Sequence, residues 1–457
     1  MMRKKRLFIA ALVAAILFLS AFAIALLPTR TRAIAPVAQG QAAALLEQGR
    51  YLAAAGDCTA CHTAQGGAPF AGGLPIASPI GTIYSTNITP DPDTGIGRYS
   101  LDQFDRALRH GIRADGGTLY PAMPYPSYAR IGDDDVRALY VYFMQGVKPV
   151  ERHNQPTGIA WPLSLRWPLA LWRRMFAPSP DALAARPALA DARLARGAYL
   201  VEGLGHCGSC HTPRALTMQE QALDASNKAY LSGGQVIDGW TAINLRGDAG
   251  SGLGGWSEQD IVDSLRTGRN PHAGTIGSPM GDVTVHSMQY LRADDLHAIA
   301  AYLKTLPAQD PAHPGFRADP STAAALAQGE DATPGAALYL DNCAGCHRSD
   351  GAGDTRTFPS IAGNPTVLAP APTSLLRLIL DGSRMPATPA APSDLGMPGF
   401  AWRLDDAQVA QLASFVRAGW GNRADPVSAA QVRKVRAQLE RERADRAKPH
   451  DPTSTRD

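Results

Sequence analysis

All six cysteines of this 457-residue chain belong to three copies of one pattern, C-x-x-C-H. Two thiols at this spacing on a helical turn can reach the two vinyl groups of one porphyrin, and the adjacent histidine then faces the iron. The pattern is typical of covalent haem attachment and predicts three haem c groups. The predicted attachment residues are Cys58, Cys61, Cys207, Cys210, Cys343 and Cys346, and the predicted axial imidazoles are His62, His211 and His347.

Other uses of paired cysteines explain the sequence less well. A C-x-x-C pair occurs in thioredoxin-like redox sites, and two such pairs together can bind zinc. Neither use requires a histidine after every pair, and neither explains why no cysteine lies outside the motifs. Disulfides that close such short loops would add little stability to so long a chain.

Helical segments recur around the motifs, which predicts an all-α fold of three tandem cytochrome c domains with long loops, preceded by an N-terminal hydrophobic helix. An aromatic–aliphatic pair lies just before each motif, where it can pack a lead-in helix on its domain. A middle helix is predicted over 101–111, 259–268 and 374–382, and each ends at glycine. A last helix begins with acidic residues at 133–135, 294–295 and 405–406, which suits the helix dipole.

The predicted organisation follows from these repeats and from the composition of the segments between them. It comprises a signal peptide or membrane anchor (1–35), a first domain (45–150), a Trp-rich linker (151–190), a second domain (191–307), a second linker (308–330), a third domain (331–423) and a charged tail (424–457).

Methionine is a common second axial ligand in electron-transfer cytochromes, and it should lie on the loop between the middle and last helices. Met123 and Met280 lie equally far past the glycine that ends the middle helix, and a proline flanks each of them. The third loop holds two candidates, Met385 and Met397. We favour Met397 because it lies nearer the last helix, as Met123 does in the first domain.

The N-terminus has the pattern of a targeting segment, with basic residues at 3–6 before an uncharged apolar run over 7–27. The basic end should stay in the cytoplasm, so the rest of the chain is expected to be exported. The run is long enough to span a bilayer, and a retained anchor and a cleaved signal are equally consistent with it.

Two further segments bear on membrane contact. Residues 161–174 mix Trp, Leu and Arg, which is typical of an interfacial segment and also of an apolar linker that packs two domains together. Residues 431–457 carry interleaved basic and acidic side chains, which indicates a charged helix or a disordered tail and argues against insertion in lipid.

Composition restricts the function further. The formal net charge of +3 gives no indication of nucleic-acid binding. No G-x-G-x-x-G fingerprint follows a predicted strand, and no cysteine is left for an iron–sulfur cluster. We therefore expect no substrate-oxidising site in this chain and no catalytic residues.

Several segments together resemble the triheme cytochrome c subunits of membrane-bound bacterial dehydrogenases for alcohol, gluconate, fructose, sorbitol or aldehyde. The resemblance covers about residues 51–422 and rests on CTACHT at 58–63, LYPAMPY at 119–125, PGFAW at 398–402 and GWGN at 419–422. It departs from the family at the C-terminus, where members often carry a membrane-binding segment and this chain carries the charged tail.

The resemblance implies an electron-transfer subunit at the periplasmic face of the bacterial inner membrane. A large dehydrogenase subunit with flavin, pyrroloquinoline quinone or molybdopterin, accompanied in some complexes by a small subunit, would supply electrons that pass through three haems to ubiquinone. The alternatives are a stand-alone multihaem enzyme, of the peroxidase or thiosulfate-oxidising type, and an anchored electron shuttle between respiratory complexes. A loop methionine in every domain argues against the enzyme, which would need an open or switchable position on one iron.

Overall fold

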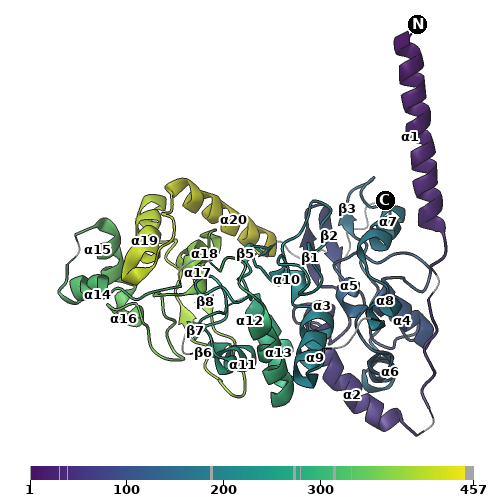
Figure 1. The fold of residues 1–457 in the computed structure, drawn as a ribbon, viewed down its shortest axis with the longest axis horizontal. Helices are drawn as coiled ribbons and strands as arrows, with labels where there is room; N and C mark the ends of the chain where they lie inside the picture. Colours follow the sequence, from purple (N-terminus) through teal and green to yellow (C-terminus); the bar gives the residue numbers. More distant parts are fainter. Residues whose placement is uncertain are drawn as a thin grey trace. The chain divides into compact units, whose positions relative to one another are not determined.

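The structure is a computed structural model that describes residues 2–447, except Arg30, Gln39, 186–188, 271–273, Ser278, 312–314 and Asp331. The described chain is mostly helical, and it divides into two compact units (Figure 1). One unit comprises 1–209 and 215–223, and the other comprises 210–214 and 224–457. The division passes through the second C-x-x-C-H motif, between Ser209 and Cys210.

The first unit holds the first motif and most of the elements before the second. Its elements are α1 (Met2–Leu26), α2 (Ala42–Ala55), α3 (Cys58–His62), β1 (Pro75–Ser78), β2 (Gly81–Tyr84), α4 (Leu101–His110), α5 (Tyr125–Tyr128), α6 (Asp133–Val141), the π-helix η1 (Tyr142–Gly146), β3 (Gly158–Ile159), α7 (Trp167–Phe176), α8 (Pro180–Ala184), α9 (Ala192–Ala198) and the π-helix η2 (Tyr199–Leu204). Helix α10 (Gly208–His211) carries the second motif across the division between the units.

The second unit holds the remaining elements. They are β4 (Val236–Ile237), β5 (Trp240–Thr241), α11 (Glu258–Thr267), β6 (Arg269–Asn270), β7 (Gly274–Thr275), α12 (Met280–His286), the 3-10 helix η3 (Met288–Tyr290), α13 (Ala293–Thr305), α14 (Pro320–Ala327), α15 (Pro334–Asn342), α16 (Ala344–His347), α17 (Pro365–Leu368), α18 (Thr373–Asp381), β8 (Ser383–Arg384), β9 (Gly396–Met397), α19 (Asp406–Ala418), the 3-10 helix η4 (Gly419–Gly421) and α20 (Ala429–Ala447).

The middle helices begin and end within a residue of the predicted positions, because their caps are encoded locally. Ser100 and Ser257 each accept a hydrogen bond from the backbone of the third helical residue, in a capping box, at the start of α4 and α11. Gly111 and Gly268 adopt left-handed conformations after the last turns, with φ of 64° and 72°. The third middle helix, α18, also ends at a glycine, Gly382, with a positive φ of 77°. All three predictions are confirmed.

A close helix crossing forms the core of the first unit, where α2 packs on α6. Gly49 of α2 lies so near the backbone of α6 that a Cβ atom there would be 2.6 Å from the Ala138 carbonyl carbon. The crossing lets Leu52, Val136 and Leu139 pack with almost no exposed surface. Only glycine permits two helices to approach this closely.

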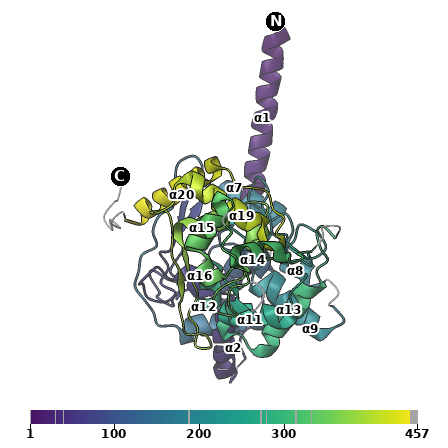
Figure 2. The same ribbon diagram turned by 90° about the vertical axis from the view of Figure 1, so that its left-hand side faces the viewer.

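The same crossing recurs in the second unit, where α15 and α19 lie side by side (Figure 2). A Cβ atom on Gly335 would be 2.6 Å from the Gln411 carbonyl oxygen. Tyr339, Phe415 and Trp420 stack beside this contact, with ring centroids 4.9–5.7 Å apart.

The C-terminal segment is a helix, α20, which packs on α18 and α19 of the same unit. Val432, Val435 and Leu439 of α20 are almost completely buried in that core. Arg377 of α18 binds Glu442 through two hydrogen bonds of 3.0 and 2.7 Å. The charge density of the segment had indicated a helix or disorder, and the structure gives the helix.

Four small antiparallel sheets accompany the helices among the described residues. One is three-stranded, in the order β1-β2-β3, and the others are the pairs β4-β5, β6-β7 and β8-β9. Strands of two to four residues carry no usable alternation of polar and apolar side chains, so the sequence did not predict them. The pair β4-β5 precedes α11 and β6-β7 follows it, whereas β1-β2 precedes α4 and β8-β9 follows α18.

Helix α1 contains the one stretch, Lys4–Leu26, that is long and apolar enough to span a membrane among the described residues. Its large apolar side chains are exposed, and within its unit it contacts the rest of the chain mainly through α7 (Figure 1). This confirms the predicted N-terminal hydrophobic helix. A retained anchor and a signal sequence both have these properties.

Candidate haem-binding sites

Each of the three motifs lies on a short helix and presents its histidine in the same way. The Nδ1 atom of His62 donates to the Thr86 carbonyl oxygen at 2.7 Å, and His211 and His347 donate to the carbonyls of Ile243 and Pro359 at 2.8 and 2.9 Å. Since a carbonyl oxygen only accepts, this contact fixes the tautomer and leaves the lone pair on Nε2. That nitrogen is then available to a metal, and the ring orientation is set by the backbone.

Burial keeps these imidazoles neutral. It lowers the pKa of His62, His211 and His347, and the hydrogen bond to a carbonyl opposes this only in part. A neutral imidazole is the form that binds iron. The three side chains are therefore in the right protonation state for axial ligation.

Cys58 and Cys343, the first cysteines of their motifs, have the properties of thiols rather than of redox-active thiolates. Burial raises the pKa of Cys58 to about 12, with a further contribution from the negative charge of Asp57. Burial likewise raises the pKa of Cys343 to about 12. A thioredoxin-like pair requires the opposite shift in its attacking cysteine. No cluster of three or more His, Cys, Asp or Glu that could hold a metal ion occurs within the described ranges.

At every motif, a glycine with a positive φ lies between the motif histidine and the peptide whose carbonyl accepts from the histidine Nδ1. The backbone N–H groups of Gly72, Gly233 and Gly353 donate to the carbonyls of His62, His211 and His347 at 2.7, 2.8 and 3.1 Å. A Cβ atom would lie 2.6 Å from the Thr86 carbonyl oxygen at Gly72, from the Asn244 nitrogen at Gly233, and from the Pro359 carbonyl oxygen at Gly353. The motif, the glycine and the acceptor thus form one compact unit that is built three times with different loop lengths.

Replacing Gly72 with alanine tests this arrangement. The new methyl group should displace the Thr86 carbonyl, tilt the His62 ring and destabilise the fold by about 1–3 kcal/mol, as overpacking does. The measurement combines thermal unfolding with the visible absorption of the haem that His62 is predicted to bind.

The matched control is Gly66→Ala. Gly66 has a φ of 68°, against 69° for Gly72, but no atom lies within 4 Å of its Cβ position. The positive φ is therefore equally unfavourable for alanine at both positions, and only Gly72→Ala introduces the clash. Equal effects of the two substitutions on the absorption spectrum would refute a role for Gly72 in orienting His62.

Met123 and Met280 follow the same kind of backbone contact, although Met123 lies in a turn before α5 and Met280 is the first residue of α12. Leu119 N–H donates to the Gly111 carbonyl and Ile276 N–H donates to the Gly268 carbonyl, both at 2.8 Å. Each methionine is the fourth residue after that contact. Met288, another methionine between the middle helix α11 and the last helix α13, is buried at 4% exposure in η3, next to the last helix.

The third loop carries its two methionines on one hairpin. Ser383 pairs with Met397 across β8 and β9, and the Met385 N–H continues the ladder by donating to Leu395 at 3.1 Å. Strand alternation places Met385 and Met397 on the same face of this hairpin. Both side chains are partly buried. The preference for Met397 therefore stays a prediction.

The first and second attachment peptides meet at Gly56, within the first unit. The Tyr128 hydroxyl donates to the Gly56 carbonyl at 2.9 Å, and His206 hydrogen-bonds the same residue's backbone. The Tyr128 and His206 rings stack edge to face with centroids 5.6 Å apart. Because Gly56 and His206 almost adjoin Cys58 and Cys207, one hydrogen bond connects the two attachment peptides. Sequence reasoning assigned His206 no function, and the repeat pattern gave no signal for this contact.

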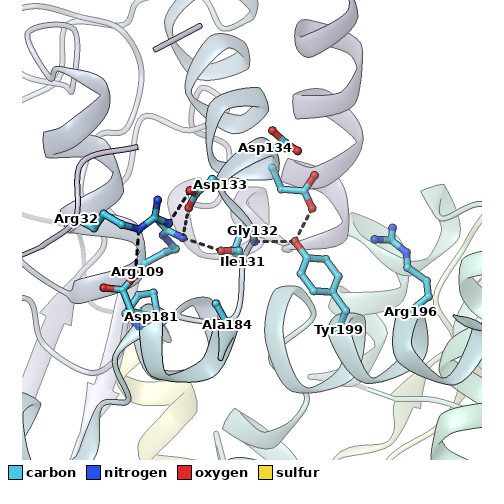
Figure 3. Close-up of a pocket in the computed structure, with 12 residues that line it drawn as sticks. Arg32, Arg109, Ile131, Gly132, Asp133, Asp134, Asp181, Ala184, Arg196 and Tyr199 are labelled. Carbon is cyan, nitrogen blue, oxygen red and sulfur yellow. Dashed lines mark hydrogen bonds and ion pairs between the residues drawn. The ribbon is translucent and has the colours of Figure 1, made fainter. Parts of the chain in front are cut away.

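A charged pocket lies elsewhere in the first unit, at the start of α6 (Figure 3). Arg32 binds Asp133 at 2.8 Å and Asp181 at 3.2 Å, and Arg109 binds Asp133 from the other side at 2.9 Å. Burial alone would raise the pKa of Asp133, but hydrogen bonds from these two arginines lower it. None of the predicted haem ligands lines this pocket. The ion pairs of this pocket connect the segment after α1 to α6.

Comparison with known proteins agrees with this chemistry. Residues 332–420 match the model of the cytochrome c family. The gluconate 2-dehydrogenase cytochrome c subunit of Pantoea cypripedii is 54% identical over 86% of this chain and 89% of its own length. The alcohol dehydrogenase (quinone) cytochrome c subunit of Gluconacetobacter polyoxogenes is 54% identical over 86% and 84%. The fructose dehydrogenase cytochrome subunit of Gluconobacter japonicus is 41% identical over 86% and 82%.

Proposed function

Because this chain belongs to the family of cytochrome c subunits of alcohol, gluconate and fructose dehydrogenases, we propose that it is the electron-transfer subunit of a membrane-bound dehydrogenase complex. The observation that carries the proposal is the threefold recurrence of a motif histidine whose Nδ1 is held by a backbone carbonyl. A structural role for the cysteines would not require this orientation.

We propose three haem c groups in three tandem cytochrome c domains. Cys58 and Cys61, Cys207 and Cys210, and Cys343 and Cys346 form the thioethers, and the axial pairs are His62 with Met123, His211 with Met280, and His347 with Met397. Bound in this way, haem c supplies an iron that takes up and releases one electron. The thioether, histidine and methionine side chains hold it, exclude water from the iron, and raise its potential through the methionine sulfur.

A large partner subunit with flavin, pyrroloquinoline quinone or molybdopterin oxidises the substrate, in some complexes with a small subunit beside it. This chain accepts the electrons and delivers them to ubiquinone. The basic residues 3–6 keep the N-terminus in the cytoplasm, so the domains lie at the periplasmic face of the inner membrane.

Purification of the tagged chain from native membranes tests this function. We expect a large dehydrogenase subunit to copurify and the complex to reduce a short-chain ubiquinone when the substrate of that subunit is added. Rapid turnover of hydrogen peroxide by the isolated chain, without a partner, would instead establish the stand-alone enzyme. Recovery of the chain with respiratory complexes and without a dehydrogenase would establish the shuttle.

A further inference from the structure

An apolar loop in the first unit is exposed although the protein around it holds it firmly. We define the apolar loop as residues 161–165, which lead into α7. Trp161, Leu163 and Leu165 are 79%, 57% and 42% exposed, and Met175 near the end of α7 is 67% exposed. Contiguous exposed side chains of this size mark an interaction surface rather than ordinary surface scatter.

The contacts of α7 fix the loop in place. The Arg166 guanidinium lies 4.4 Å from the centre of the Tyr120 ring and donates to the Thr118 carbonyl at 3.3 Å. The Trp172 indole N–H donates to the Thr217 carbonyl at 2.7 Å, and its ring packs edge to face on Tyr125. The loop is therefore displayed by a rigid support, and its exposure is not a consequence of a loose segment.

Helix α1 ends beside this surface. Phe18 and Phe22 pack edge to face on Trp167, the first residue of α7, with ring centroids 5.4 and 5.5 Å apart. Arg173 donates to Thr29 at 2.7 Å, and Arg174 binds the Leu27 carbonyl. The outer end of the candidate membrane span is thus attached to α7 by aromatic and polar contacts.

The attachment of α7 to α1 determines the depth of α7 in a bilayer. The span Lys4–Leu26 has 23 residues, which as a helix covers roughly 34 Å and matches a hydrocarbon core of about 30 Å. Its C-terminal end then marks the bilayer surface, and Trp167 lies beneath that surface, because it contacts Phe22 and Phe18, which are about 6 and 12 Å before the end of the span. Tryptophan and arginine are the residues that favour this interface.

Charge favours the same occupant. Residues 161–176 contain no acidic residue, and of their three arginines Arg174 is exposed, whereas Arg166 and Arg173 contact the protein. Anionic phospholipid headgroups attract such a segment, and the apolar side chains enter the layer beneath them.

We propose that the apolar loop and α7 form a membrane-binding face that inserts into the surface of an anionic phospholipid bilayer where α1 leaves it. The inference rests on the proposed export of the chain to the membrane, and it adds the surface through which the first domain meets the lipid. It gives the chain a second membrane contact besides α1.

Protection of a single introduced thiol tests the proposal in the full-length haem-loaded chain, reconstituted in liposomes of phosphatidylglycerol and phosphatidylcholine. The variant is Trp161→Cys, and the matched control is Trp402→Cys, because Trp402 is 82% exposed against 79% for Trp161. A membrane-impermeant charged maleimide should label the Trp161→Cys thiol about tenfold more slowly than the control thiol when the side chain lies beneath the headgroups.

Equal labelling rates of the two variants in liposomes would overturn the proposal. If protection appeared only after the dehydrogenase subunit was added, the proposal would also be overturned, because the face would then bind protein and not lipid. Labelling of the unsubstituted chain reports separately on the proposed function, since thioether-bound cysteines do not react. Strong labelling of the unsubstituted chain would contradict haem attachment. The ratio between the two variants is still interpretable after this background is subtracted from both.

Discussion

Loss of about one third of the covalently bound haem is expected when Cys343 and Cys346 are both replaced by serine. The two thioethers are the covalent links proposed for the third haem, so without them that haem is no longer attached to the chain. The mass of the purified chain should fall by one haem, and reduction of quinone by the complex should be lost if that haem lies on the electron path. Mass spectrometry and the pyridine haemochrome spectrum measure the first effect.

The control for this variant is Gly345→Ala, within the same motif. No atom lies within 4 Å of the Cβ position of Gly345, and its φ is not in the left-handed region, so alanine should fit without loss of haem. An unchanged haem content in the double serine variant would show that the third motif binds no haem. The same loss in Gly345→Ala would show a failure of folding or export instead.

Substitution of Met397 by alanine is the second large effect that we expect. The haem on His347 should lose its sulfur ligand and its potential should fall markedly, since a methionine ligand is what raises it. About one third of the sulfur-to-iron charge-transfer absorption of the oxidised chain should disappear. A redox titration followed by visible spectroscopy gives both quantities.

Met385→Ala is the comparison that decides between the two candidates. Met385 lies on the same hairpin and on the same face, and its side chain is also partly buried, so the two variants disturb the loop to a similar extent. We expect Met385→Ala to keep the full absorption. The reverse result would transfer the ligand to Met385, and loss in neither variant would mean that another group binds the iron.

Helices were predicted well because their signals are local. Ser100 and Gly111 fix the two ends of α4 within a stretch that the sequence displays directly, and the same holds for Ser257 and Gly268 of α11. Helix α20 was harder to predict, because charged residues surround Val432, Val435 and Leu439 and obscure their helical spacing. The packing of these three side chains on α18 and α19 stabilises the helix.

The supports of the candidate sites could not be predicted for a different reason. The histidines are read from the motif, but the carbonyl acceptors Thr86, Ile243 and Pro359 follow at three different separations along the chain. Only the folded backbone brings them to the same place. The paired glycines at 72–73 and 233–234 were a usable signal, because each first glycine has a positive φ and abuts the acceptor peptide.

The close crossing of the first and last helices of a domain affects how the chain matures. Gly49 precedes the first motif and Ala138 follows it at a distance, so their contact forms only after the whole stretch between them has emerged from the export channel. Cys58 and Cys61 lie within that stretch, so under the proposed export they emerge before α2 and α6 can pack. Gly335 and Gln411 impose the same order on the third motif. Under the proposed export, attachment of the three proposed haems is expected to proceed from the first motif to the third in step with translocation.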